Sequence, residues 1–149
     1  QRFGLNYIDD TGRQCQPYMV HRAIFGSLER FMGILIEHYG GVFPIWLAPV
    51  QAEIIPQADR HNEYADEVRM HLVGRGLRAH SDTRNERMGA KIREAQMKKI
   101  PYMMVVGDRE LSTKQVSVRL LSGENLGPMD LESIVSRIST EDRSRSLGI

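Results

Sequence analysis

Arg30 lies one turn into a stretch that otherwise has the spacing of an apolar helix. A guanidinium stays charged and offers a planar fork of donors, so an arginine here suits a phosphate group. The spacing equally admits a solvated arginine, or one paired with Glu29 or Glu37. The apolar side chains around it recur at intervals of three and four, as one helical stripe does; they are Leu28, Phe31, Met32, Leu35, Ile36 and Tyr39.

A second candidate site is the segment 81–100, which is basic although the whole chain has a formal net charge of only +1. It holds three carboxylates and six cations, which are Arg84, Arg87, Lys91, Arg93, Lys98 and Lys99. The segment follows an expected strand, and open α/β sheets bind ligands at the carboxyl ends of their strands. Arginine, asparagine and glutamate side chains suit the reading of splayed RNA bases. A solvated basic helix is the alternative interpretation.

The remaining polar residues do not point to other chemistry. His21 has no histidine or cysteine at ligand spacing, and a zinc site needs three or four protein ligands. The stretch 107–119 lacks the Gly-Lys-Ser/Thr signature of a phosphate-binding loop. The single cysteine, Cys15, excludes an internal disulfide and favours a reducing compartment. No apolar run approaches the roughly 20 residues that span a bilayer, so we expect a cytoplasmic protein without a membrane partner.

Two expected units position these residues. Residues 2–8 and 17–22 have strand-like composition with turn formers between them, and a glycine pair ends the helix that follows. Pro44 marks a change of pattern. Beyond it, strands are expected at 51–56, 77–81, 102–107 and 114–121, helices at 59–73, 89–99 and 129–138, and a turn at 122–127. This order predicts an α/β domain over residues 44–149, with a mixed, mostly parallel sheet flanked by helices.

The chain resembles the threonine–tRNA ligase family of class II aminoacyl-tRNA synthetases along essentially its whole length. The resemblance rests on "MVHRAIFGSLERFMGILIEHYGG", "FPIWLAPVQ", "DTRNERMGAKIREAQMKKIPYMMVVGDRE", "VSVR" and "LGPMDLESIV". The first of these looks like the third signature motif of the class, in which a glycine precedes a helix with an arginine near its start. The resemblance implies that residues 1–43 are the C-terminal end of an antiparallel catalytic domain, a strand pair plus this helix. Residues 44–149 would be an anticodon-binding domain.

The resemblance also implies roles for single residues. Arg30 would bind the ATP phosphates. His21 would be one ligand of a catalytic zinc ion whose other ligands lie upstream in the family, and Ser27 would line the same threonine pocket as this zinc. The residues expected to read the anticodon are Asn85, Arg87, Arg93, Glu110 and Arg119. The intact enzyme would activate threonine with ATP and Mg²⁺, transfer it to tRNA(Thr), carry one Zn²⁺ per subunit and form a homodimer.

The chain by itself is expected to be catalytically inactive and to bind none of these cofactors tightly, because most of the ATP site and threonine pocket lies upstream of Gln1 in the family. One alternative is a free-standing RNA-binding module, and another is a protein-interaction subunit without catalysis. Arg30 argues against both, because neither needs a residue for ATP phosphates. We further expect Glu110 and Arg119 to contact anticodon bases together if the strands at 102–107 and 114–121 pair.

Overall fold

The computed structural model describes residues 3–145 and residue 147 of the 149-residue chain. The chain divides into two compact units between Ile34 and Leu35. This division falls inside the first long helix. The domain boundary expected between residues 43 and 44 stays a prediction.

The N-terminal unit contains the expected hairpin in a shorter form. Strands β1 (Tyr7–Ile8) and β2 (Gln14–Cys15) pair antiparallel, with Tyr7 opposite Cys15. The expectation of a second strand at residues 17–22 is wrong, because the chain turns back earlier. The Asp9 carboxylate accepts hydrogen bonds from the backbone N–H groups of Thr11 and Arg13, both at 2.9 Å, and so closes a tight turn. Part of the expected first strand, Arg2, lies outside the described residues.

The helix that carries Arg30 forms as expected but is not buried. Helix α1 spans Leu28–Tyr39, and none of its residues is buried. Only Phe31, Leu35 and Tyr39, which are spaced by four, are half-buried. The rest of the apolar stripe, Leu28, Met32 and Ile36, is exposed.

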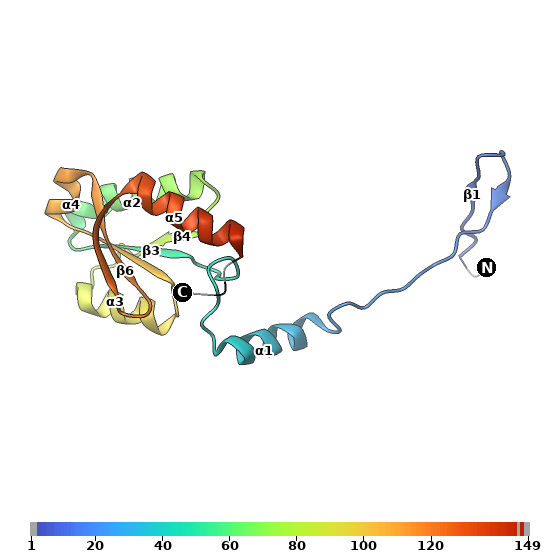
Figure 1. The fold of residues 1–149 in the computed structure, drawn as a ribbon, viewed down its shortest axis with the longest axis horizontal. Helices are drawn as coiled ribbons and strands as arrows, with labels where there is room; N and C mark the ends of the chain where they lie inside the picture. The colour runs from blue at the N-terminus through green and yellow to red at the C-terminus, as the bar shows by residue number, and fades with distance from the viewer. Residues whose placement is uncertain (1–2, 146, 148–149) are drawn as a thin grey trace. The chain divides into compact units, whose positions relative to one another are not determined.

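A five-stranded mixed sheet forms the centre of the C-terminal unit (Figure 1). Its strand order is β4 (Ala79–Ser81), β3 (Ala52–Pro56), β5 (Tyr102–Val106), β6 (Gln115–Leu120) and β7 (Asn125–Asp130). Strand β3 pairs parallel with β4 and β5, whereas β5–β6 and β6–β7 are antiparallel. The expected α/β class and mixed sheet are confirmed. The sheet is half parallel rather than mostly parallel, because β7 adds a second antiparallel pair.

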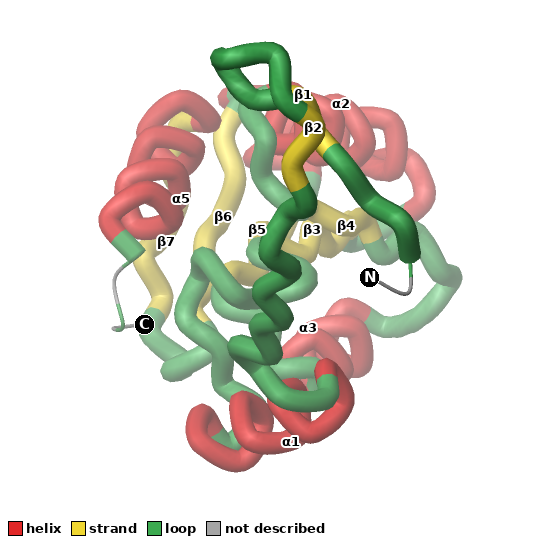
Figure 2. Tube along the Cα trace, turned by 90° about the vertical axis from the view of Figure 1, so that its right-hand side faces the viewer, coloured by secondary structure: helices red, strands yellow, loops and turns green. Residues whose placement is uncertain are grey.

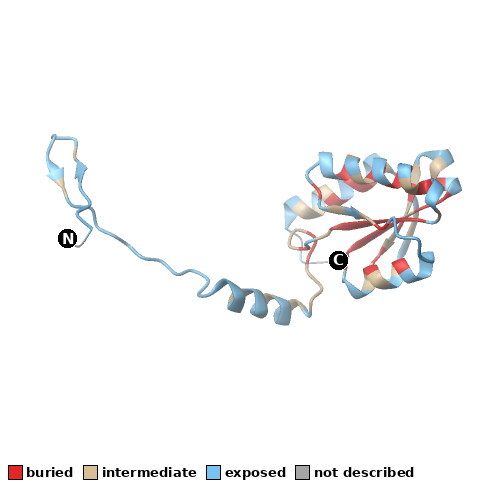
Figure 3. Cartoon of the chain, turned by 180° about the vertical axis from the view of Figure 1, so that it is seen from behind, coloured by how far each residue is buried: buried red, intermediate tan, exposed pale blue. Residues whose placement is uncertain are grey.

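Helices cover both faces of this sheet. Figure 2 shows β3 and β4 between α2 (Asn62–Gly74) and α3 (Met88–Met97). Helix α5 (Leu131–Ser144) lies on the same face as α2. Buried residues concentrate in the strands and on the inner sides of the helices (Figure 3). In β6 the apolar Val116, Val118 and Leu120 alternate with polar residues, and the structure places all three in the core shared with α2 and α5.

Two elements of the structure are not predicted by the sequence patterns. Helix α4 (Asp108–Thr113) occupies a stretch for which the sequence patterns predict no helix, and β7 occupies part of the expected turn at 122–127. Gly127 and Pro128 of β7 are poor strand formers. The hairpin pairing to β6 therefore overrides local propensity in β7.

A buried tyrosine connects the sheet to α5. Tyr102 is 1% exposed, and its hydroxyl donates to the Glu141 carboxylate at 2.8 Å and accepts from Nε of Arg137 at 3.1 Å. Burial, and next the Glu141 charge and hydrogen bond, raise the pKa of Tyr102 to about 12. The polar end of a core residue is thus satisfied between the sheet and the helix.

Candidate nucleic-acid interface

The carboxyl ends of the three parallel strands meet at one edge of the sheet. Strand β3 runs into Gln57, β4 into the loop 82–87 before α3, and β5 into Gly107 before α4. The sequence patterns indicate a ligand site at this edge, and the loop after β4 holds part of the basic segment.

A pocket of about 190 Å³ opens between the start of α3 and the sheet. Its apolar lining comes from Met88 and Ile92 of α3 and from Val105 of β5. The polar lining comes from residues on three separate parts of the chain, which are Gln57, Ser117, Arg119 and Asn125. Apolar surface beside a few convergent polar groups is the usual composition of a ligand site.

Arg119 extends from β6 into the lining of this pocket. Strands β5 and β6 do pair, with Arg119 opposite Met103, so the pairing on which the base-reading expectation depended is confirmed. Arg119 is half-buried and forms no ion pair with any residue among those described. Its guanidinium donors are therefore free for a ligand.

Glu110 lies behind the pocket rather than in its lining. The residue is 8% exposed in α4, and its carboxylate accepts hydrogen bonds from the Gly107 N–H at 3.0 Å and from the Ser117 hydroxyl at 2.9 Å. Ser117 and Arg119 are two residues apart on one strand and share a face. The geometry connects Glu110 to the pocket through Ser117.

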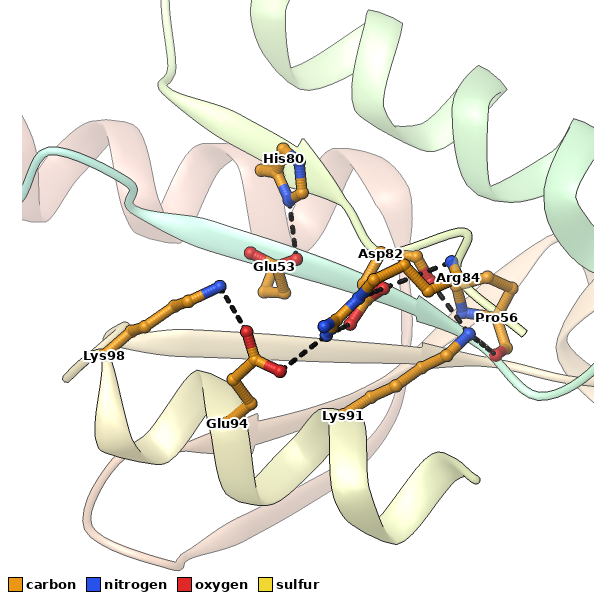
Figure 4. Close-up of polar contacts among 8 residues, drawn as sticks. All are labelled: Glu53, Pro56, His80, Asp82, Arg84, Lys91, Glu94 and Lys98. Atoms are coloured by element: carbon orange, nitrogen blue, oxygen red, sulfur yellow. Dashed lines mark hydrogen bonds and ion pairs between the residues drawn. The ribbon is translucent and has the colours of Figure 1, made fainter. Parts of the chain in front are cut away.

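Three of the six cations in the segment 81–100 bind other residues of the domain; they are Arg84, Lys91 and Lys98 (Figure 4). Arg84 forms two hydrogen bonds to the Asp82 carboxylate, at 2.8 and 2.6 Å, and a third to Glu94 at 2.7 Å. Lys98 pairs with the other oxygen of Glu94 at 2.7 Å. The Arg84 guanidinium lowers the pKa of Asp82, and Lys98 followed by Arg84 lowers the pKa of Glu94. These charges hold α3 against the loop after β4.

Lys91 is a buried cation at the same place. It is 5% exposed, and its ammonium donates to the Asp82 carbonyl at 2.9 Å and to the Pro56 carbonyl at 3.3 Å (Figure 4). The side chain thereby joins α3 to the end of β3 and to the residue that directly follows β4. Lys91 is a structural residue, which its position in a basic run did not reveal.

The three residues of this segment expected to read RNA are instead exposed. Asn85, Arg87 and Arg93 form no ion pair or side-chain hydrogen bond within the described part of the chain. Asn85 and Arg87 belong to the loop before α3, and Arg87 is its N-cap residue. Two free guanidinium groups thus lie on the loop and helix that border the pocket.

A second charged cluster holds the start of α4. Asp108 accepts two hydrogen bonds from Arg60, at 2.8 and 2.6 Å, and one from Nε2 of His61 at 2.9 Å. His61 is 1% exposed, and its Nδ1 accepts from the Ala58 N–H, which places the ring proton on Nε2. Hydrogen bonds from Arg60 and then His61 hold the pKa of Asp108 well below its usual value.

His21, Ser27 and Arg30 are all exposed in the N-terminal unit. The Ser27 hydroxyl accepts from the Arg30 N–H at 3.2 Å, which is the geometry of a helix N-cap. Arg30 forms no ion pair with Glu29, Glu37 or another described residue. Within the described residues, no three histidine, cysteine, aspartate or glutamate side chains come together as metal ligands.

Sequence reasoning missed Gln57, Ser117 and Asn125 as members of the pocket. Gln57 directly follows the strand expected at 51–56. Because ligands bind at the carboxyl ends of strands in open α/β sheets, its position could have indicated a site residue. Asn125 lies in a stretch interpreted as a turn, and no local pattern separates it from other turn residues.

Free cations around a polar pocket at a sheet edge are characteristic of an α/β domain that binds nucleic acid. The chain belongs to the anticodon binding domain family, whose sequence pattern matches residues 48–141. It is 53% identical to a threonine–tRNA ligase of Halorhodospira halophila over 94% of this chain, and 49% identical to one of Acetivibrio thermocellus over 93%. It spans 22% of the length of each of these relatives. The predicted resemblance is confirmed: the chain corresponds to the C-terminal, anticodon-binding portion of threonine–tRNA ligases.

Solved structures agree with this assignment. A crystal structure of the RNA binding domain of threonyl-tRNA synthetase from Cryptosporidium parvum matches 94% of this chain, and 36% of its own, with a TM-score of 0.74 at 33% identity. Prolyl-tRNA synthetase from the same organism matches 95% of this chain and 30% of its own, with a TM-score of 0.67. At 21% identity the second likeness shows the fold alone. Among the described residues, none of the helices is long and apolar enough to cross a bilayer.

Proposed function

We propose that the C-terminal unit binds the anticodon loop of tRNA(Thr) at the carboxyl edge of its sheet. The observation that carries the proposal is Arg119, a half-buried arginine that lines the pocket and has no ion pair among the described residues. The exposed Arg87 and Arg93 lie on the loop and helix whose Met88 and Ile92 line the same pocket. Exposed cations attract the phosphate backbone of RNA, and a pocket for a splayed base supplies sequence selection.

The genetic code sets what such a domain has to read. Threonine codons are ACN, so threonine anticodons share G at the second position and U at the third, and vary at the first. Arg119 presents a fork of donors that matches O6 and N7 of guanine. Ser117 donates its proton to Glu110, so its oxygen is left to accept from a ligand. Glu110 thus contributes by orienting Ser117, while Asn85, Arg87 and Arg93 contact further bases or phosphates.

Binding of anticodon stem-loops tests this function. Wild type should prefer a loop with G at the second anticodon position over one with A. Arg119→Ala should lose about 1–3 kcal/mol for the G loop and most of the preference, whereas Arg87→Ala should weaken both loops alike and reduce the salt dependence. Arg143→Ala is the matched control, because it removes an exposed arginine from α5, on the opposite face of the sheet. Equal binding of both loops by wild type would refute the proposal.

We propose further that a longer protein containing this chain is a threonine–tRNA ligase, which activates threonine with ATP and Mg²⁺ and works as a homodimer. Support comes from the similarity to threonine–tRNA ligases and from Arg30, whose guanidinium is exposed and unpaired in the described residues. In this proposal Arg30 binds the ATP phosphates, and Ser27 caps the helix that presents it. Catalysis needs all reacting groups in one geometry, so the 149-residue chain alone should be inactive.

Pyrophosphate exchange with threonine and ATP measures this activity. The 149-residue chain should show none, and Arg30→Ala should abolish exchange in the longer protein while Glu37→Ala, on the same helix, should not. Exchange by the chain alone would contradict the proposal.

His21 does not make a zinc site with the residues described around it. A zinc ion needs three or four ligands, and the described residues bring no second and third ligand to His21. The role of His21 as one zinc ligand stays a prediction for the longer protein.

A further inference from the structure

Gly107 lies directly beside the side chain of Gln57 at the rim of the pocket. Its φ of −134° is open to any residue, so the backbone conformation does not require glycine. A Cβ at this position would lie 2.6 Å from Cδ of Gln57 and 2.7 Å from its Oε1. The missing side chain therefore leaves the space that the Gln57 amide occupies.

The backbone holds Gln57 in this place. The residue follows the last pair of β3 and β5, Pro56 and Val106, and its N–H donates to the Val106 carbonyl at 3.0 Å. Its side-chain amide lines the pocket and makes no hydrogen bond to another residue in the described ranges. An amide offers one acceptor oxygen and two donors, so Gln57 brings unused hydrogen-bonding groups to a ligand.

Asn125 keeps both of its amide donors free within the described residues. Its Oδ1 accepts from the Gly127 N–H at 3.0 Å, in a local turn that Gly127 permits with a φ of +76°. This bond fixes which end of the amide is oxygen, so the Nδ2 donors are the groups left free. Asn125 pairs with Arg119 across β6 and β7.

The pocket therefore has a donor side and an acceptor side. Arg119 and Asn125 supply the donors, and the Ser117 hydroxyl oxygen and the side-chain oxygen Oε1 of Gln57 supply the acceptors. Guanine carries the acceptors O6 and N7 next to the donors N1–H and N2–H₂. Adenine places an amino group where guanine has O6, so its amino group would face the donor side without a partner.

We infer that Asn125 and Gln57 read the second anticodon base and make the pocket specific for guanine, an inference that rests on the proposed anticodon-binding function. Asn125 donates to O6 beside Arg119, and the Gln57 carbonyl accepts from the N–H edge beside Ser117. Gly107 is a positioning residue, because it acts by leaving room for Gln57.

Asn125→Asp tests the donor side. Aspartate keeps the oxygen that accepts from Gly127, so the turn is retained, but it replaces the free donors by an acceptor. The measured quantity is the ratio of affinities for stem-loops with G and with A at the second position, because repulsion of RNA by the new charge affects both loops. This ratio should fall about ten-fold, the effect of one lost base contact. A change smaller than about three-fold would overturn the role of Asn125.

A double-mutant cycle tests Gln57 and Gly107. Gly107→Ala should displace only the flexible end of Gln57, so the unfolding midpoint should change little while the preference for G falls. Gln57→Ala should lower the preference to a similar extent, and Gly107→Ala should add nothing in the Gln57→Ala background. Additive effects, or an unchanged preference in Gly107→Ala, would overturn the inference.

The anticodon-binding function and the assignment of Asn125 and Gln57 predict different results in this experiment. If wild type binds the G and A loops equally, the proposed anticodon-binding function is wrong. If wild type prefers G and Arg119→Ala removes the preference, but Asn125→Asp and the cycle leave it intact, the function stands and the assignment of Asn125 and Gln57 is wrong.

Discussion

Replacing Lys91 by methionine removes a buried charge while keeping most of the side-chain volume. The Lys91 side chain hydrogen-bonds through its ammonium, to the carbonyls of Asp82 and Pro56. Methionine fills the space of the lysine stem and leaves both carbonyls without this donor. The connection between α3 and the ends of β3 and β4 should therefore weaken without a large cavity.

The expected loss of stability follows from the lengths of the two hydrogen bonds that the Lys91 ammonium donates. A hydrogen bond from a charged donor contributes about 1.5–3 kcal/mol. The 2.9 Å bond to Asp82 falls in the normal range, whereas the 3.3 Å bond to Pro56 is longer than usual and adds little. Releasing the ammonium from a site where it is 5% exposed returns part of its desolvation cost. We expect Lys91→Met to lower the free energy of unfolding by about 1.5–3 kcal/mol.

Urea unfolding measures this loss, and the single tryptophan, Trp46, serves as a fluorescence probe of the C-terminal unit. With an m-value of about 2 kcal/mol/M, the midpoint should fall by roughly 1 M. Lys98→Met is the matched control on the same helix: Lys98 is 58% exposed and pairs with Glu94, and its loss should cost at most about 0.5 kcal/mol. If Lys91→Met is no less stable than Lys98→Met, the structural role assigned to Lys91 is wrong.

Two further predictions concern pH. Hydrogen bonds from Arg60 and His61 lower the pKa of Asp108. The ionised carboxylate therefore stabilises the fold fully at pH values above the ordinary aspartate pKa of about 4, and this stabilisation is lost as the pH falls below that value. Asp108→Asn should therefore lose stability near neutral pH and show a weaker acid dependence, measured by urea midpoints at several pH values, and an unchanged acid profile would contradict this. The pKa of Tyr102 is raised to about 12, so its contribution is full below about 10 and is lost as pH rises toward 12. Tyr102→Phe should cost about 1–2 kcal/mol at neutral pH and show a weaker alkaline dependence by circular dichroism, because the bond to Glu141 is absent; wild-type stability would refute the role of the hydroxyl.

The sequence by itself predicts most of the C-terminal fold, because periodicity is a local property that survives without tertiary contacts. In the sequence, Val116, Val118 and Leu120 alternate with polar residues, and Tyr64, Ala65, Val68 and Leu72 recur at helical spacing; the structure buries both sets. The sequence also marks the carboxyl edge of the sheet as basic and carries motifs of threonine–tRNA ligases, which the relatives confirm. It does not predict β7, whose glycine and proline oppose the strand that pairing with β6 imposes.

Only the tertiary structure decides which polar residues are available to a ligand. Six cations of the basic segment look alike in sequence, yet Lys91 is buried against backbone carbonyls while Arg87 is exposed. Glu110 lies behind Ser117 because α4 packs against the end of β6. Gln57 and Gly107 are distant in sequence and become neighbours because β3 and β5 pair in parallel, with the crossover of α2, β4 and α3 between them. Such contacts depend on strand order and register, which no short-range pattern of residues encodes.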